Sequence, residues 1–201
     1  LDGEELWVST AGRGLWSIDL TNRIFAPTPA ALHAQMDGMV LEDDGTMYVG
    51  LMGNEGSAAG FQRFNTATRT WGHGSLIAGL PSDIVRDFLE YGDHIMVATY
   101  GGIGLWNTTK DDWDDPITTI DGLPTPISNH LFVPPSPVLG NGTVLIGGPI
   151  GIISLDQNLS VSGYAGRSHG LLGDFVSGIV YAGPVSRMVN DTATGTTATI
   201  H

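Results

Sequence analysis

One short segment of the chain concentrates carboxylates: residues 111–115 include Asp111, Asp112, Asp114 and Asp115. Carboxylate oxygens are ligands that Ca²⁺ binds in proteins, so a loop folded around these side chains would make a calcium site. The alternative interpretation is a solvated turn that holds no ion. Calcium is the one cofactor that the sequence suggests.

A second group of polar residues lies at turns that we expect on one face of the fold. Because strand direction alternates in an antiparallel sheet, the loop before a first strand and the loop between the second and third strands share a face. Such a rim could hydrogen-bond a glycan or a peptide, with Tyr100 as a stacking surface. The alternative is a set of solvated loops without a ligand. The candidate ligand-binding residues are Arg13, Asn54, Glu55, Ser82, Asp83, Tyr100, Thr125, Ser128 and Asn129.

Sequence patterns typical of enzymes do not occur in the chain. It contains no His-x-His, His-Glu-x-x-His or Gly-x-Ser-x-Gly pattern, and its six histidines are scattered at positions 33, 73, 94, 130, 169 and 201. The glycines at 12 and 14, and those at 101, 102 and 104, resemble nucleotide-binding loops, but we expect no helix after them, and similar glycines return along the chain. We therefore expect no catalytic residues and no enzyme activity. Scattered histidines that meet at an axis would be the remaining route to a metal site.

The charge of the chain narrows the choice of partners. It has 21 acidic and 8 basic residues, which gives a net charge of −13. An acidic surface repels phosphate groups, so we expect neither nucleic acid nor an anionic membrane as a partner. No apolar run approaches the roughly 18 to 20 residues that cross a bilayer, so no membrane insertion is expected within this segment. The absence of cysteine excludes disulfides and thiolate metal sites.

The elements that would position these residues are short apolar strands that return four times. They lie at residues 6–10, 47–51, 95–99 and 144–148, each followed by a glycine-containing turn. The glycines that open the next strands are at 14, 60, 104 and 151, so the period is 44 to 47 residues, which is typical of all-β repeat arrays. We place the repeats at 1–34, 35–78, 79–121, 122–168 and 169–201. Because the chain starts at Leu1 within a repeat, we expect it to be part of a longer polypeptide.

Each repeat contains four expected strands. In the third repeat they cover residues 84–89, 95–99 and 104–107, with a short outer strand that ends at Trp113, and the outer strands of three repeats carry Phe25, Trp71 and Trp113. Four short antiparallel strands per unit describe the blade of a β-propeller, and neighbouring blades bury one another's apolar faces. We predict an all-β propeller, a single domain over residues 1–201, with about four to five blades. An arc of a larger propeller is favoured over a compact closed ring, and an arc would self-associate through its exposed blade edges.

Several of these residues carry a resemblance to a known family. Residues 80–90, 94–99 and 101–106 of the third repeat, and 6–10 and 12–16 of the first, resemble the two-component-regulator propeller repeat, with its Leu-Pro turn and Gly-rich turn into the third strand. The resemblance covers residues 1 to about 155. The chain departs from it in a longer turn at 53–59 and in a Thr-rich fifth repeat. The resemblance implies an extracytoplasmic propeller (extracellular, cell-surface or periplasmic) without a shared catalytic motif.

Three functions remain open at this point. The expected one is a non-enzymatic binding module of a larger secreted or cell-surface protein, with a protein or a glycan as its ligand. The alternative is the extracytoplasmic sensor input domain of a two-component-type regulator. A second alternative is a propeller lyase or glycosidase, which would need carboxylates or histidines that converge at the propeller axis.

Overall fold

The protein is an all-β molecule built from short antiparallel sheets. The computed structural model describes residues 5–32, 35–52, 60–72, 78–135, 142–179, 187–191 and 196–200. Within these ranges the helical segments are two single 3-10 turns, Thr119–Asp121 and Arg167–His169. No helix in the described part of the chain is long and apolar enough to cross a membrane. The predicted fold class is therefore confirmed.

Four sheets follow one another along the chain, and in each the strands pair in sequence order. Blade 1 has three strands, β1 (Glu5–Thr10), β2 (Gly14–Asp19) and β3 (Ile24–Pro27). Blade 2 has four strands, β4 (Met36–Leu41), β5 (Thr46–Leu51), β6 (Gly60–Asn65) and β7 (Thr70–Trp71). Blade 3 contains β8 (Val85–Tyr91), β9 (His94–Thr99), β10 (Ile103–Asn107) and β11 (Asp112–Ile117). Blade 4 contains β12 (His130–Phe132), β13 (Val144–Gly148), β14 (Gly151–Leu155) and β15 (Val161–Ala165).

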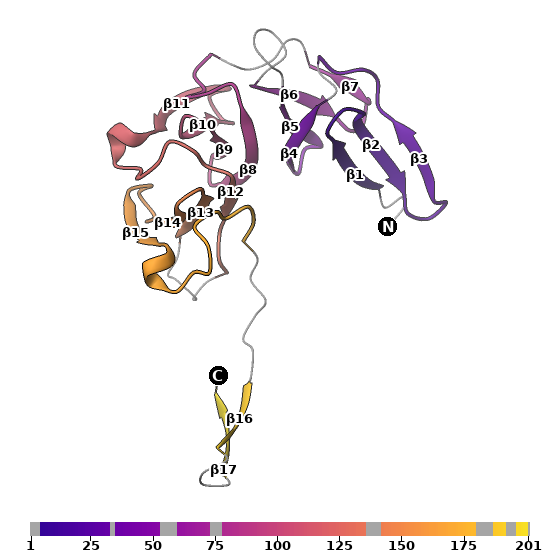
Figure 1. Ribbon diagram of the computed structural model, residues 1–201. Helices are drawn as coiled ribbons and strands as arrows, with labels where there is room; N and C mark the ends of the chain where they lie inside the picture. Colours follow the sequence, from indigo (N-terminus) through magenta and orange to yellow (C-terminus); the bar gives the residue numbers. More distant parts are fainter. Residues whose placement is uncertain are drawn as a thin grey trace.

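The blades form an open arc of about four propeller blades, with blade 1 and blade 4 at its two ends (Figure 1). The first strands of blades 2, 3 and 4 lie next to one another, since β8 contacts both β4 and β12. These inner strands approach closely: a Cβ added at Gly38 on β4 would lie 2.6 Å from the Cα of Asp87 on β8. The arc, rather than the compact ring, is the arrangement observed.

The glycine that opens the third strand of each blade differs from the sequence-based assignment in one case. The backbone has a positive φ at Gly14, Gly60, Gly102 and Gly151. In blade 3 the equivalent residue is thus Gly102, whose carbonyl accepts a hydrogen bond from the Thr99 hydroxyl at 2.8 Å, and not Gly104. Only glycine adopts such a φ without strain, which explains its return in every blade.

The outer strand of blade 3 also differs from the sequence-based assignment. Strand β11 begins at Asp112 and continues past Trp113 to Ile117, instead of ending at the tryptophan.

Each blade has two apolar faces, and counting from the positive-φ glycine before or at the start of its third strand (the second strand of blade 1 as described) assigns residues to them. The residue directly after this glycine faces the next blade, and we call this side the forward face. The fourth residue after it faces the preceding blade, and we call this side the backward face. Forward-face residues are Leu15, Phe61, Ile103 and Ile152; backward-face residues are Ile18, Phe64, Trp106 and Leu155.

Three apolar clusters fill the spaces between consecutive blades, as predicted for a blade array. Phe61 of blade 2 is fully buried against Trp106 of blade 3, with ring centroids 6.2 Å apart. Leu15 packs with Phe64 between blades 1 and 2, and Ile103 packs with Leu155 between blades 3 and 4. Burial of apolar area at these interfaces is the main stabilising contribution to such a fold.

The fifth repeat does not form a blade in the described residues. Its described strands, β16 (Arg187–Asp191) and β17 (Thr196–Ile200), pair with each other in a two-stranded hairpin. Figure 1 shows this hairpin apart from the four blades. The described residues contain four blades, the lower of the two numbers expected. The Thr-rich sequence of the fifth repeat lacks the apolar residues that would pack against a neighbouring blade.

Candidate functional site

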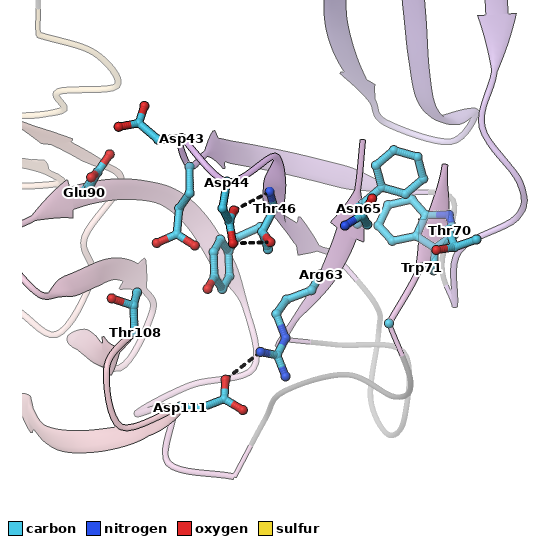
Figure 2. Close-up of a pocket in the computed structure, with 14 residues that line it drawn as sticks. Asp43, Asp44, Thr46, Arg63, Asn65, Thr70, Trp71, Glu90, Thr108 and Asp111 are labelled. Carbon is cyan, nitrogen blue, oxygen red and sulfur yellow. Dashed lines mark hydrogen bonds and ion pairs between the residues drawn. The ribbon is translucent and has the colours of Figure 1, made fainter. Parts of the chain in front are cut away.

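A cavity of about 690 Å³ lies between blades 2 and 3. Blade 2 contributes the turn between β4 and β5, together with residues of β5, β6 and β7 (Figure 2). Blade 3 contributes the end of β8 and the turn between β10 and β11. We call this space the inter-blade cavity, and its lining residues are Glu42, Asp43, Asp44, Thr46, Tyr48, Arg63, Phe64, Asn65, Thr70, Trp71, Gly72, Glu90, Thr108 and Asp111.

Carboxylates dominate the charge of the inter-blade cavity. Five acidic side chains line it against one cation, Arg63, whose Nη1 lies 2.6 Å from Oδ1 of Asp111 across the two blades. Asp44 accepts hydrogen bonds from the backbone N–H and the hydroxyl of Thr46, at 2.7 and 3.1 Å. Since the single cation is already paired, the cavity presents a surplus of hydrogen-bond acceptors and negative charge.

The electrostatics of Glu42 and Tyr48 follow from their position at the base of the cavity. Burial raises the pKa of Glu42, the charges of Asp44 and Glu90 raise it further, and a hydrogen bond from Tyr48 opposes the shift. Burial is also the main cause that raises the pKa of Tyr48, and the nearby Glu42 adds to it. Tyr48 therefore keeps its proton beside Glu42.

An aromatic wall closes one side of the cavity. The rings of Phe64 and Trp71 lie 4.8 Å apart, and Trp71 Nε1 donates a hydrogen bond to the Pro29 carbonyl at 2.8 Å. The indole is thus held in one orientation by blade 1. Phe64 is fully buried, so the half-buried Trp71 is the aromatic surface that a ligand with C–H faces and hydrogen-bond donors could contact.

The rim predicted from the sequence is only partly available to a ligand. Thr125, Ser128 and Asn129 are buried, with exposed fractions of 8, 1 and 7%. Backbone hydrogen bonds hold this face together: Ser128 N–H donates to Thr99, and Gly60 N–H donates to the carbonyl of Asp83. Ser82 and Asp83 are half-buried. These rim residues are buried because backbone hydrogen bonds join the loop that enters each blade to the blade before it.

Two rim residues are exposed in the structure, and two lie outside the described residues. Arg13 is exposed in the turn after β1, and Tyr100 is 41% exposed above Arg86, whose Cζ lies 6.0 Å from the ring centroid. Asn54 and Glu55 lie outside the described residues. Arg13 and Tyr100 belong to different blades, and a ligand site on this rim stays a prediction.

The carboxylates of residues 111–115 have different partners in the structure. Asp111 pairs with Arg63, and Asp112 accepts the backbone N–H of Trp113 at 2.8 Å. Asp114 belongs to a separate network, described below, and Asp115 is exposed on β11. Among the residues that the structure describes, no three His, Asp or Glu side chains gather to hold a metal. Alternation of side chains along β11 separates these carboxylates.

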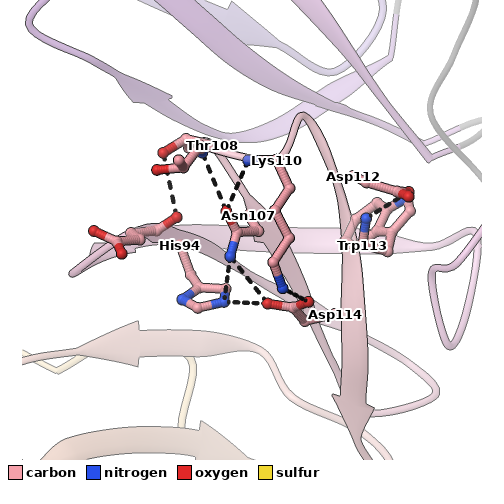
Figure 3. Close-up of polar contacts among 9 residues, drawn as sticks. His94, Asn107, Thr108, Lys110, Asp112, Trp113 and Asp114 are labelled. Carbon is pink, nitrogen blue, oxygen red and sulfur yellow. Dashed lines mark hydrogen bonds and ion pairs between the residues drawn. The ribbon is translucent and has the colours of Figure 1, made fainter.

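Asp114 is the centre of a polar network on blade 3 (Figure 3). Its carboxylate receives Lys110 Nζ at 2.5 Å, His94 Nε2 at 2.8 Å and Asn107 Nδ2 at 3.0 Å. The carbonyl oxygen of the Asn107 side chain in turn accepts the backbone N–H groups of Thr109 and Lys110. The network ties β9, β10 and β11 together at the turn that also supplies Asp111 to the inter-blade cavity.

The Asp114 network predicts a defined pH dependence of stability. The hydrogen bond from Lys110, followed by those from His94 and Asn107, lowers the pKa of Asp114. A folded-state pKa below the unfolded value of about 3.9 gives a contribution that is present above pH 4 and lost as the pH falls through the folded pKa. The urea midpoint of wild type should therefore exceed that of Asp114→Asn at pH 6, and the gap should narrow progressively as the pH falls below 4. Asp115→Asn is the matched control, and a gap between wild type and Asp114→Asn that stays constant with pH would contradict the assignment.

Charged residues on the inner strands form a second cluster that the sequence did not single out. Arg86 Nη1 on β8 lies 2.6 Å from Asp37 Oδ2 on β4. Asp87 Oδ2 accepts the Leu131 N–H at 2.9 Å and lies 2.6 Å from His130 Nδ1 on β12. Desolvation by burial raises the pKa of Asp87 in spite of these partners. The cluster links the first strands of blades 2, 3 and 4.

The Asp87–His130 pair has no free ring nitrogen. Nδ1 is at the Asp87 carboxylate, and Nε2 lies 3.2 Å from the carbonyl oxygen of Ile179, which can only accept a hydrogen bond. Both nitrogens are therefore committed to contacts between neighbouring segments. His130 on β12 thus links Asp87 on β8 to the segment that contains Ile179. The signal for it in the sequence is the presence of Asp37, Arg86, Asp87 and His130 within otherwise apolar strands.

The comparisons with known proteins agree with this architecture. No family model matches the chain, and no curated protein matches it. Among solved structures, the extracellular domain of a putative hybrid two-component system from B. thetaiotaomicron is similar at 19% identity and a TM-score of 0.63, over 88% of this chain and 22% of that one. The extracellular domain of a putative one-component system from the same organism gives 15% identity and a TM-score of 0.66, over 96% and 24%.

A third similar structure is that of the RRP9 WD40 repeats, with 12% identity and a TM-score of 0.61 over 86% of this chain and 48% of that one. The chain spans about a quarter of the length of the two bacterial extracellular domains. At these identities the likeness shows the fold. The resemblance of the repeats to two-component-regulator propeller repeats is confirmed at that level.

Proposed function

We propose that this β-propeller segment is a non-enzymatic binding module of an extracellular or periplasmic protein, and that its ligand site is the inter-blade cavity. The observation that supports the proposal is the combination of a cavity of about 690 Å³ between two blades, five carboxylates and the half-buried indole of Trp71. Such a site suits a ligand with positive charge and several hydrogen-bond donors. An amino-sugar oligosaccharide has both, together with C–H faces that pack against an indole.

Two features favour binding over catalysis. The Asp111 carboxylate is held by Arg63 at 2.6 Å, so it is fixed as an acceptor. The Asp87–His130 pair, which would be the natural acid–base pair of a propeller lyase or glycosidase, has both ring nitrogens committed to contacts with its own protein. A general base needs a nitrogen within reach of substrate.

The proposal predicts charge-selective binding of a glycan. The probe is a fully deacetylated glucosamine tetramer, titrated into the protein by calorimetry, and its N-acetylated counterpart is the uncharged control. We expect the charged tetramer to bind and the acetylated one to bind at least about tenfold more weakly, because exposed charge pairs contribute about 0.2 to 1 kcal/mol each.

The same titration with variants locates the site. Asp43→Asn combined with Glu90→Gln removes two exposed cavity carboxylates, and we expect it to weaken binding of the charged tetramer about tenfold. Asp115→Asn removes one exposed carboxylate outside the cavity and should leave the affinity unchanged. Equal affinities for the two tetramers, no binding of either, or an unchanged affinity of the double variant would overturn the proposal.

A sensor input domain is the second candidate, because two of the similar structures are extracellular domains of regulatory systems. A ligand held between blades 2 and 3 would bias the angle between them, which is how a binding event reaches distant contacts in a packed array. Hydrogen exchange with the charged tetramer separates the two candidates. A sensor would show altered exchange in blade 4, whereas a binding module alone would show it only around the cavity.

A further inference from the structure

Side chains on the inner strands form a series of polar contacts that crosses all four blades. Ser9 Oγ on β1 donates to the backbone carbonyl of Asp37 on β4 at 2.7 Å. The carboxylate of Asp37 pairs with Arg86 on β8, and Asp87 on β8 pairs with His130 on β12, each at 2.6 Å. His130 makes one further contact, with the segment that follows blade 4.

Residues 174–179 lie on blade 4, and we call them the docked segment. The Val176 N–H donates to the carbonyl of Gly148 at 2.8 Å, and a Cβ added at Gly147 would lie 2.8 Å from Val176 Cγ1. The carbonyl oxygen of Ile179 lies 3.2 Å from Nε2 of His130. His130 therefore holds Asp87 on one side and the docked segment on the other.

The two contacts of His130 require two protons. A carbonyl oxygen only accepts, so Nε2 carries a proton towards Ile179. Oδ2 of Asp87 accepts the Leu131 N–H at 2.9 Å and lies 2.6 Å from Nδ1, so a second proton lies between the carboxyl and the ring. This proton belongs to the pair, whether it is drawn on Nδ1 or on the carboxyl. The pair thus holds one proton more than a carboxylate beside a neutral imidazole.

Loss of the extra proton breaks one of the two contacts. A neutral imidazole has a single N–H, and a carboxylate attracts it more strongly than an uncharged carbonyl does, because charge-assisted hydrogen bonds are about twice as strong. The remaining proton therefore stays on Nδ1, beside Asp87. The lone pair of Nε2 then faces the lone pairs of the Ile179 oxygen, and the contact with the docked segment is lost.

The other contacts of the series do not change in the same pH range. Imidazole is the side chain that ordinarily changes its charge between pH 5 and 8. The donors of the other contacts are the hydroxyl of Ser9 and the guanidinium of Arg86, which keep their protons there. Burial raises the pKa of the Asp87 carboxyl, which helps the pair to retain its proton.

The charged groups around the pair are themselves paired. Arg86, next to Asp87 in the chain, lies at Asp37 of β4, and Asp174 at the start of the docked segment lies 3.9 Å from Arg167. The residues opposite the pair in the sheets are uncharged: Ala98 of β9 faces Asp87, and Gly147 of β13 faces His130. Residues 176–179 are Val-Ser-Gly-Ile and contain no titratable side chain.

We propose that His130 is a pH-sensitive link, which fastens the docked segment to blade 4 while the Asp87–His130 pair holds its extra proton and releases the segment when that proton leaves. The contact is complete at mildly acidic pH and is lost as the pH rises. The link lies at blade 4, whereas the inter-blade cavity lies between blades 2 and 3. It therefore operates without the proposed ligand.

Hydrogen exchange at two backbone amides of the same sample tests the link. The Val176 amide reports on the docked segment, and the Ser128 amide, which donates to Thr99 at 2.9 Å, is the control one blade earlier. Between about pH 5.5 and about pH 8.5 we expect the protection factor of Val176 to fall at least about tenfold, because a hydrogen bond to a charged group is lost. Ser128 should keep its protection, since the contact with Asp87 remains. Constant protection of Val176, or an equal fall at both amides, would overturn the proposal.

Nitrogen NMR of the imidazole ring follows the protons directly. We expect both ring nitrogens of His130 to be protonated at about pH 5.5, and Nδ1 alone at about pH 8.5. The midpoint of this change should coincide with that of the Val176 exchange. A single proton on Nε2 at the higher pH, or two transitions at different pH values, would contradict the link.

Two variants separate the proton from the packing. His130→Asn cannot titrate, so the protection of Val176 should no longer depend on pH. Asp87→Asn keeps an acceptor oxygen but removes the negative charge that favours the imidazolium, so the transition should move about one pH unit or more towards acid. Asp115→Asn, at an exposed carboxylate of β11, is the matched control and should leave the transition in place. A wild-type fall in His130→Asn would overturn the proposal; if that variant does not fold, an unmoved transition in Asp87→Asn would do so.

Discussion

Trp106→Ala is expected to lower the free energy of unfolding by about 3 to 5 kcal/mol, the range for removal of a buried tryptophan side chain. Trp106 is 4% exposed and lies edge-on to Phe61 of blade 2, with Trp113 of its own blade at a centroid distance of 5.2 Å. Its loss would leave a void between blades 2 and 3 that neighbouring rings cannot fill, because they are held by sheet backbones.

Urea unfolding followed by circular dichroism measures this effect, at a concentration at which sedimentation shows a monomer. Ile120→Ala serves as the control, since this side chain is 94% exposed and should change the midpoint little. Trp106→Ala should also widen the floor of the inter-blade cavity, because Arg63 Cζ lies 5.6 Å above the Trp106 ring. An unchanged midpoint would show that the interface between blades 2 and 3 does not stabilise the protein in solution.

Gly102→Ala is the second substitution with a large expected effect. The φ of Gly102 is +134°, and a Cβ there would lie 2.4 Å from the carbonyl oxygen of Ile117 on the neighbouring strand. A strained φ costs about 1 to 3 kcal/mol, and the backbone of β11 must move in addition, so we expect a loss of about 3 kcal/mol or more.

Gly92→Asn provides the matched comparison for Gly102→Ala. Gly92 has a φ of +60° in the turn between β8 and β9, and no atom lies within 4 Å of a Cβ built on it. Asparagine tolerates this left-handed conformation, so the substitution should cost less than about 1 kcal/mol. Equal urea midpoints for the two variants would show that a Cβ at residue 102, close to the Ile117 carbonyl, does not lower the stability.

Local features of the chain could be predicted from the sequence because they depend on residues close together in it. The hairpin turns, the apolar second and third strands and the outer-strand aromatics Phe25, Trp71 and Trp113 all follow from turn chemistry and alternation. The sequence analysis placed the start of the third strand of blade 3 at Gly104, and this was wrong because Gly102, two residues earlier, has the positive φ. A positive φ, which selects Gly102, is a property of the folded turn and not of the local sequence pattern.

The candidate site was harder to predict because its residues meet across blades. Glu42 and Asp44 come from the second repeat and Glu90 and Asp111 from the third, so their proximity depends on how two sheets stack. The burial of Ser128 has the same origin, since it is covered only when its loop is fastened to Thr99 of the blade before it. Stacking angles arise from side-chain packing over whole sheets, which no short motif encodes.

The contacts between inner strands bear on how the number of blades can change during evolution. Asp37–Arg86 and Asp87–His130 join neighbouring sheets through side chains, while every strand ladder of the four blades closes within its own sheet. A gene duplication that inserts or deletes one whole unit therefore interrupts no strand ladder. It requires that the new neighbours present compatible side chains and re-form the loop hydrogen bonds between blades, such as that from Ser128 N–H to Thr99. Ancestral chains could lengthen or shorten by single units while remaining foldable at each step.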